Sequence, residues 1–147
     1  MTLPIAAPTQ RERDVVAYVA EGWANDEIGV ALNLAPSTVA RHLQIVSARY
    51  RVTTREALVD LSLARGYIRP PDAGPSPGFS EKEMQLIRLV AADYRLPAIS
   101  AAMGMSKSTA LRKLTNARSK AGARGNAHLI ALCFAWGLLP VAREAVS

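Results

Sequence analysis

Serine, threonine and arginine recur in the same order at two places in the chain. These residues are Ser37, Thr38 and Arg41 and, 71 positions later, Ser108, Thr109 and Arg112. An arginine can form two hydrogen bonds with the O6 and N7 atoms of guanine. Hydroxyl groups and free backbone N–H groups in the first turn of a helix suit phosphate oxygens. The pattern favours nucleic-acid recognition if both segments are helices that expose these side chains.

The sequence around these residues repeats as well. A shift of 71 residues aligns Thr9–Ile68 with Ser80–Leu139 without a gap, and thirteen aligned positions are identical. Self-similarity of this kind predicts two copies of one fold. The segment 69–78 between the copies holds four prolines and two glycines, which predicts a short, semi-stiff linker. The expected domains are therefore 1–68 and 79–147.

Each copy is predicted to contain four helices. Thr9 to Glu12 and Ser80 to Glu83 match the capping box that begins a helix, and Thr53 to Glu56 offers another for the fourth helix. Third helices are expected over 36–50 and 107–121, each after a three-residue turn, which is the helix-turn-helix arrangement. The expected fold class is all-α, with two tandem four-helix helix-turn-helix domains joined by the Pro-rich linker.

Composition agrees with helices and with a polyanionic partner. Of 147 residues, 50% are hydrophobic and 26 are alanine, and 18 Lys+Arg against 12 Asp+Glu give a net charge of +6. No acidic residue occurs over 28–55 or 94–143, so both third helices are uniformly positive. A positive surface suits nucleic acid or an anionic membrane, and its recurrence on both third helices favours nucleic acid.

Other classes of site are poorly supported by the sequence. The single Cys133 cannot form a disulfide within the chain, and no metal-ligand spacing occurs around it. The longest apolar run, Leu129–Leu139, is too short to cross a bilayer. His42 has no acid or second histidine beside it, and its counterpart is Lys113. We therefore expect no cofactor, no metal, no membrane partner and no enzymatic activity, and a cytoplasmic, nucleoid-associated location.

Several motifs of the first copy match a known family. They are Thr9-to-Val16, Ala20-Glu-Gly22, Asn25-to-Ile28 and above all Pro36-to-Leu43, followed by Val52 and Arg55. Over nearly all of residues 8–68, the copy resembles the LuxR/GerE-type DNA-binding domain of bacterial regulators. The second copy is a more distant match that keeps Ser80-to-Glu83 and Ser106-to-Thr109. The resemblance implies a third helix that reads the major groove and a fourth that makes a dimer contact.

The resemblance also implies which side chains meet DNA. The base-reading positions would be Ala40, Arg41 and Gln44 in the first copy and Leu111, Arg112 and Thr115 in the second. The phosphate-contacting residues are expected to be Ser37, Thr38, Arg49, Lys107, Ser108, Thr109, Lys113 and Arg118. Ala40 and Leu111 depart from the family, where lysine is common, so the family's half-site sequence does not carry over.

The last helix of the second copy, 126–136, is apolar on nearly all sides. Such a helix is buried or binds a partner, and Leu129, Leu132 and Trp136 are the expected interface residues. It could be covered by Val141–Val146, by the fourth helix of the other copy, or by a second chain. Self-association is therefore expected through the fourth helices, either within one chain as a pseudo-dimer or as a homodimer.

The sequence predicts a transcription regulator that reads two DNA half-sites with its two copies. In the alternative, only the first copy reads DNA, while the second is a dimerisation module or docks a protein such as RNA polymerase or another regulator. A third possibility is nonspecific architectural binding of DNA.

Overall fold

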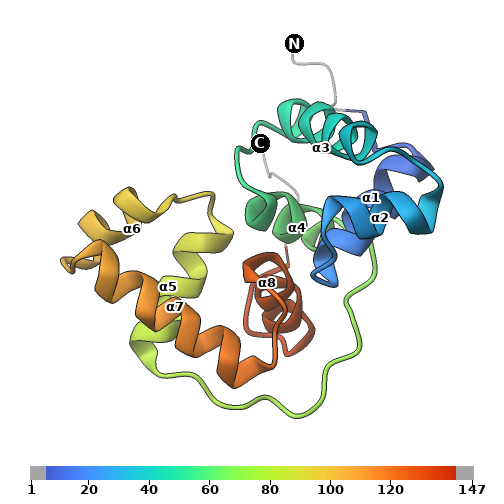
Figure 1. Ribbon diagram of the computed structural model, residues 1–147. Helices are drawn as coiled ribbons and strands as arrows, with labels where there is room; N and C mark the ends of the chain where they lie inside the picture. The colour runs from blue at the N-terminus through green and yellow to red at the C-terminus, as the bar shows by residue number, and fades with distance from the viewer. Residues whose placement is uncertain (1–5, 142–147) are drawn as a thin grey trace, which may run out of the picture.

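The computed structural model describes residues 6–141, and these fold into eight α-helices without a strand (Figure 1). The first half, residues 6–68, contains α1 (Gln10–Ala20), α2 (Asn25–Leu32), α3 (Pro36–Tyr50) and α4 (Arg55–Ala64). The second half, residues 79–141, contains α5 (Glu81–Ala91), α6 (Leu96–Met103), α7 (Lys107–Ala121) and α8 (Asn126–Ala135). Every helix of the second half begins and ends 71 residues after its counterpart. The all-α fold class is confirmed.

Both halves begin with the predicted capping box. The hydroxyl of Thr9 accepts a hydrogen bond from the amide of Glu12 at 3.1 Å, and the Glu12 carboxylate accepts one from the amide of Thr9 at 2.8 Å. Ser80 and Glu83 make the same two bonds at 3.1 and 2.8 Å. Each pair satisfies two backbone donors that the helix itself leaves unpaired, so α1 and α5 start at matching residues.

The start of α4 differs from the sequence prediction. Thr54 caps the helix, and its hydroxyl accepts a hydrogen bond from the amide of Ala57 at 3.1 Å. The predicted capping box of Thr53 with Glu56 is wrong, because the amide and hydroxyl of Thr53 instead donate to the carboxylate of Asp93. That partner lies 40 residues away, where no local pattern could indicate it.

Apolar faces of the helices form the core. On α3 the four residues with helical spacing, Val39, Leu43, Val46 and Tyr50, are all buried. On α1 the buried apolar residues are Val15, Val16, Val19 and Ala20, and on α5 they are Leu86, Ile87, Val90 and Ala91. Burial of these faces leaves the opposite sides of α3 and α7 toward solvent.

The apolar last helix is covered by the first half of the same chain. α8 makes its most extensive contact with α4, and the two lie together between α1–α3 and α5–α7 (Figure 1). Leu129 and Leu132 are buried, and Trp136 is half-buried with its indole N–H donating to the carbonyl of Gly74 at 2.6 Å. Val141, one end of the segment considered as a cover, is exposed, and 142–146 lie outside the described residues.

The linker passes around the outside of the molecule from Ile68 to Phe79 (Figure 1). Trp136 packs near the ring of Phe79, with 6.0 Å between ring centroids, and its hydrogen bond to Gly74 ties the linker to the second half. Among the helices over 6–141, none has both the length and the apolar character needed to span a membrane.

Candidate nucleic-acid interface

The outward side of α3 carries the base-reading residues predicted for the first half. Arg41 and Gln44 are exposed, and Ala40 is half-buried beside them. Their orientation follows from the core, because Val39, Leu43 and Val46 anchor the opposite side of the helix. Ser37 is exposed and Thr38 half-buried in the first turn of α3, where the amide of Thr38 donates to the carbonyl of Ala35 at 3.0 Å.

The position of α3 depends on the turn before it, in which the backbone of Leu34 lies close to Gly29 of α2. The amide of Leu34 donates to the carbonyl of Gly29 at 2.8 Å. A Cβ atom on Gly29 would lie 2.4 Å from the carbonyl oxygen of Leu34, so only glycine permits this approach. Asn33 ends α2 with a φ of 57°, a left-handed conformation that asparagine tolerates. The turn therefore sets the angle between α2 and α3.

α7 presents the corresponding face of the second half. Leu111, Arg112 and Thr115 are exposed, opposite the buried Ala110, Leu114 and Ala117. Ser106 caps the helix, since its hydroxyl accepts a hydrogen bond from the amide of Thr109 at 3.1 Å. The predicted phosphate-contacting residues Lys107 and Ser108 are exposed in the first turn, whereas Thr109 and Lys113 are half-buried.

A groove of about 260 Å³ lies beside the predicted base-reading residues of the first half, and we call it the first groove. Its lining comes from the start of α2, the middle of α3 and the start of α4, namely Asn25, Ala40, Leu43, Gln44, Ser47, Thr53, Thr54 and Arg55. The guanidinium of Arg55 donates to the side-chain oxygen of Asn25 across this groove. Sequence reasoning did not place either residue in the site, although Arg55 at the first position of a helix was a usable signal.

The second half has a groove of about 240 Å³ at the equivalent place, which we call the second groove. It is lined by Thr54, Glu56, Val90, Tyr94, Arg95, Leu96, Ile99, Leu111, Leu114 and Asn126. Leu96 replaces Asn25 here, and Leu111 replaces Ala40. Leu111 is 48% exposed and Tyr94 43% exposed, so the second groove presents larger apolar side chains than the first.

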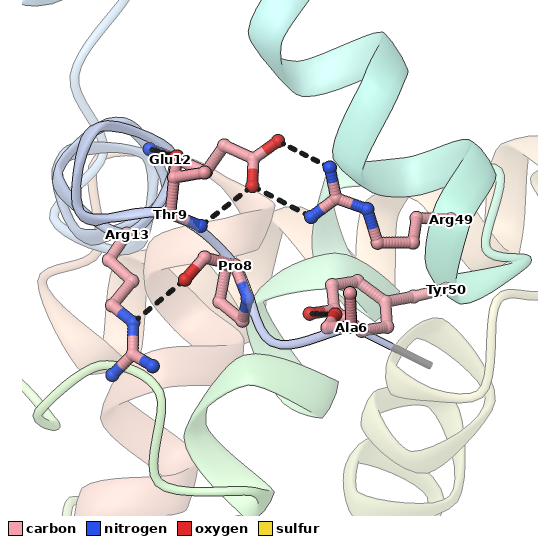
Figure 2. Close-up of polar contacts among 7 residues, drawn as sticks. All are labelled: Ala6, Pro8, Thr9, Glu12, Arg13, Arg49 and Tyr50. Atoms are coloured by element: carbon pink, nitrogen blue, oxygen red, sulfur yellow. Dashed lines mark hydrogen bonds and ion pairs between the residues drawn. The ribbon is translucent and has the colours of Figure 1, made fainter. Parts of the chain in front are cut away.

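Arg49, predicted to contact phosphate, makes a structural ion pair instead (Figure 2). Its guanidinium donates two hydrogen bonds to the carboxylate of Glu12, at 2.7 and 2.9 Å. Burial raises the pKa of Glu12, but the hydrogen bonds from Arg49 and Thr9 outweigh it and leave the pKa lowered. Glu12 is only 4% exposed. We therefore assign Arg49 to holding α3 against α1 and leave it out of the interface.

The second half repeats this support with a different cation. Lys120, the counterpart of Arg49, donates to the carboxylate of Glu83 at 2.7 Å. The hydrogen bonds from Lys120 and Ser80 likewise outweigh the effect of burial and leave the pKa of Glu83 lowered. α3 and α7 are thus each fixed at the C-terminal end to the first helix of the same half.

Arg118, also predicted to contact phosphate, is engaged within the protein. It donates to the side-chain oxygen of Asn126 at 3.1 Å and to the hydroxyl of Thr115 at 3.1 Å. It therefore links α7 to the start of α8 and orients Thr115. His128 accepts a hydrogen bond from the amide of Arg124 at 3.0 Å, and burial together with the Arg124 charge lowers its pKa. No cluster over 6–141 could hold a metal ion.

Comparison with known proteins found a family match within the first half. Residues 8–62 match the family model described as bacterial regulatory proteins, luxR family. Proteins of Mycobacterium bovis and Mycobacterium tuberculosis, each named "Putative HTH-type transcriptional regulator", are 43% identical to the chain over 58 residues. That match covers 40% of this chain and 7% of each relative, so the chain spans a small part of their length. No solved structure matches.

Proposed function

We propose that the chain, whose residues 8–62 form a LuxR-type helix-turn-helix domain, is a transcription regulator that binds double-stranded DNA and reads its sequence. The observation that carries the proposal is the exposed pair Arg41 and Gln44 on α3, held outward by a buried opposite face. The relatives are named as transcriptional regulators rather than enzymes, and the proposal assigns no catalytic step.

The reading chemistry follows from the two side chains. With α3 in the major groove, Arg41 suits the O6 and N7 atoms of guanine and Gln44 suits the N6 and N7 atoms of adenine. Phosphate oxygens are expected to meet the first turn of α3 at Ser37 and Thr38. Arg55 adds a positive charge at the start of α4, beside the same groove.

The proposal extends to a second half-site read by α7. Arg112 occupies the position of Arg41, 71 residues later, and is exposed in the same way. α7 also carries the cations Lys107 and Lys113 and no acidic residue. Because Leu111 and Thr115 stand where the first half has Ala40 and Gln44, the two half-sites are expected to differ in sequence.

A second candidate function follows from the second groove. Its apolar lining and the exposed side chains of Leu111 and Tyr94 suit a protein surface better than a phosphate backbone. In this candidate α7 docks another regulator or an RNA polymerase subunit, and only α3 reads DNA.

Arginine substitutions separate the two candidates. Arg41→Ala is expected to weaken binding to a selected duplex by about tenfold to a hundredfold, since a bidentate arginine–guanine contact is worth about 1–3 kcal/mol. The exposed linker residue Arg69 offers a matched control, because Arg69→Ala removes the same charge away from both reading helices. Binding is measured by fluorescence anisotropy over a range of salt concentrations.

Arg112→Ala decides whether α7 reads DNA. A loss clearly larger than that of Arg69→Ala supports a second reading helix, whereas an unchanged affinity and salt dependence favours the docking candidate. If Arg41→Ala behaves like Arg69→Ala, the proposal of sequence reading by α3 is wrong.

A further inference from the structure

The contacts between the two halves are reciprocal. α1 contacts α8, and α5, the counterpart of α1, contacts α4, the counterpart of α8. The same exchange holds for single residues. Gly22, in the turn after α1, lies against Arg124 before α8, and Asp93, at the position equivalent to Gly22, binds Thr53, at the position equivalent to Arg124.

Reciprocity of this kind indicates a two-fold relation between the halves. In a two-fold interface a residue i that contacts j implies that j also contacts i, whereas a head-to-tail arrangement pairs different surfaces. The reading helices α3 and α7 make no contact with each other in the described chain and lie on opposite sides of the α4–α8 pair (Figure 1). Two helices related in this way would meet half-sites in inverted order.

The two halves meet at two equivalent contacts, which we call joints: Asp93 with Thr53, and Gly22 with Arg124. The first joint is a set of hydrogen bonds that we call the clamp. The carboxylate of Asp93 accepts hydrogen bonds from the amide of Thr53 at 2.9 Å, the amide of Thr54 at 2.8 Å and the Thr53 hydroxyl at 3.2 Å. The guanidinium of Arg95 donates to the carbonyl of Thr53 at 3.0 Å. Asp93 thereby places a negative charge at the positive end of the α4 dipole, and it does so from the other half.

The other joint, between Gly22 and Arg124, is tightly packed. A Cβ atom on Gly22 would lie 2.6 Å from the Cβ of Arg124 and 3.3 Å from the Cβ of His128, and Gly22 has a φ of 86°. No larger residue fits there without displacing the start of α8. Directional hydrogen bonds at one joint and the absence of space at the other both oppose rotation of one half against the other.

The helices through which a second chain could form a homodimer, α4 and α8, already cover each other within one chain. On α4 the residues Leu58, Val59 and Leu63 are buried within the single chain, as are Leu129, Ile130 and Cys133 on α8. A homodimer through the fourth helices would have to open this contact and expose both apolar faces.

We propose that the chain binds DNA as a one-chain pseudo-dimer, in which α3 and α7 meet two unequal half-sites in inverted order at one fixed spacing and Asp93 is the positioning residue. This inference rests on the proposed function for its DNA part. Its structural part, the fixed placement of the two halves, can be tested without DNA.

Spin labels on α3 and α7 measure that placement directly. Ala48 and Ser119 are exposed and occupy equivalent positions, so Ala48→Cys with Ser119→Cys provides two labelling sites. The native Cys133 is buried, which raises its pKa to about 12 and keeps it unreactive. The full chain is expected to give one narrow distance distribution, and light scattering is expected to give the mass of one chain, 15.8 kDa.

Asp93→Gly removes the clamp without backbone strain, because Asp93 has a φ of 74° and the equivalent residue is already glycine. We expect this variant to remain folded and its distance distribution to broaden. Asp72→Gly in the linker removes the same charge from an exposed site and should leave the distribution narrow. An unchanged distribution in Asp93→Gly overturns the positioning role, and a broad one in the parent chain or a two-chain mass overturns the pseudo-dimer.

The DNA part is tested on the duplex that the full chain selects from random sequence. Rearranging its half-sites from inverted to direct order, or moving them apart by about half a helical turn, is expected to weaken binding about tenfold or more. Asp93→Gly should reduce that penalty and Asp72→Gly should not. Equal affinity for direct and inverted order overturns the inference. If no sequence is selected, the proposed function fails, while the distance measurement still decides whether the halves are fixed.

Discussion

The first and second grooves occupy equivalent places but differ in chemistry. The first is lined by Asn25, Ala40 and Arg55, whereas the second is lined at matching positions by Leu96, Leu111 and Asn126. The second groove also takes Thr54 and Glu56 from the first half, so it is partly closed by the joint between the halves. A helix-turn-helix scaffold can thus be kept while the surface beside its reading helix changes.

The supports beneath the two reading helices are much more alike than the grooves. Glu12 and Glu83 each complete a capping box and each bind a cation from the end of the reading helix. The helix bounds match throughout. The comparison indicates that placement of the reading helix is common to both halves, and that the difference between them lies in what the helix presents.

The largest expected effect tests the shared support. Glu12→Ala is expected to lower the free energy of unfolding by about 2–3 kcal/mol, because it removes a capping contact and leaves Arg49 without its partner in a partly buried pair. Glu83→Ala should cost about 1–2 kcal/mol, since Lys120 makes one hydrogen bond and its side chain is 39% exposed. Urea unfolding measures both losses.

The exposed Glu81, in the first turn of α5 but outside the ion pair, provides the control, and Glu81→Ala should change stability little. If Glu12→Ala and Glu83→Ala are both as mild as Glu81→Ala, the ion pairs do not support the reading helices.

A position at which the halves differ gives the next largest effect. Asp60 on α4 has a buried carboxyl oxygen without a hydrogen-bond partner among the described residues, and burial raises its pKa to about 6. Its counterpart, Ala131, is fully buried and apolar. Since the unfolded carboxyl titrates near 3.8, the folded state holds more protons between these values, and this group lowers stability as pH rises through that window.

Asp60→Asn should therefore raise the free energy of unfolding at pH 7 by about 1–2 kcal/mol, after allowance for the remaining exposure of Asp60. Near pH 4 the variant and the parent should differ much less. Urea unfolding at several pH values checks the sign, with the exposed Asp72→Asn as control. A variant that is less stable than the parent at pH 7 would show that the Asp60 charge is favourably paired.

The smallest expected effect concerns Leu111, an exposed residue on α7 of the second half. If Leu111 meets a base in the major groove, its exposed side chain is suited to the C5-methyl group of thymine. Replacing one thymine by uracil in the second half-site should then weaken binding by about threefold to fivefold, an apolar contact of up to about 1 kcal/mol. In Leu111→Ala the same replacement should have little effect.

Anisotropy with paired thymine and uracil duplexes makes this measurement, and a uracil in the first half-site serves as the control. Equal losses in the parent and in Leu111→Ala would show that Leu111 does not contact a thymine methyl group. The docking candidate would then gain support.

Local patterns were sufficient to predict the fold class and the bounds of α3 and α7. The capping boxes at Thr9 and Ser80, the cap at Ser106 and the buried stripe on α3 are determined by residues within one or two turns of each other. The exposed positions of Arg41, Gln44 and Arg112 follow from the same periodicity.

Features that depend on distant parts of the chain were missed. The assignment of Arg49 to phosphate was not kept because its partner, Glu12, is 37 residues away. The N-cap of α4 was predicted at Thr53 and is Thr54, because Thr53 donates hydrogen bonds to Asp93 of the second half. Charge and helix position alone do not distinguish a cation that is free to meet DNA from one that is bound to a buried carboxylate.

Reading of DNA sequence by both α3 and α7 can be tested by selecting bound duplexes from a random-sequence pool with the chain 1–147. We expect enrichment of two different half-sites in inverted order, with guanine among the bases that Arg41 and Arg112 meet. A pool that shows no enrichment, or only one half-site, would contradict it.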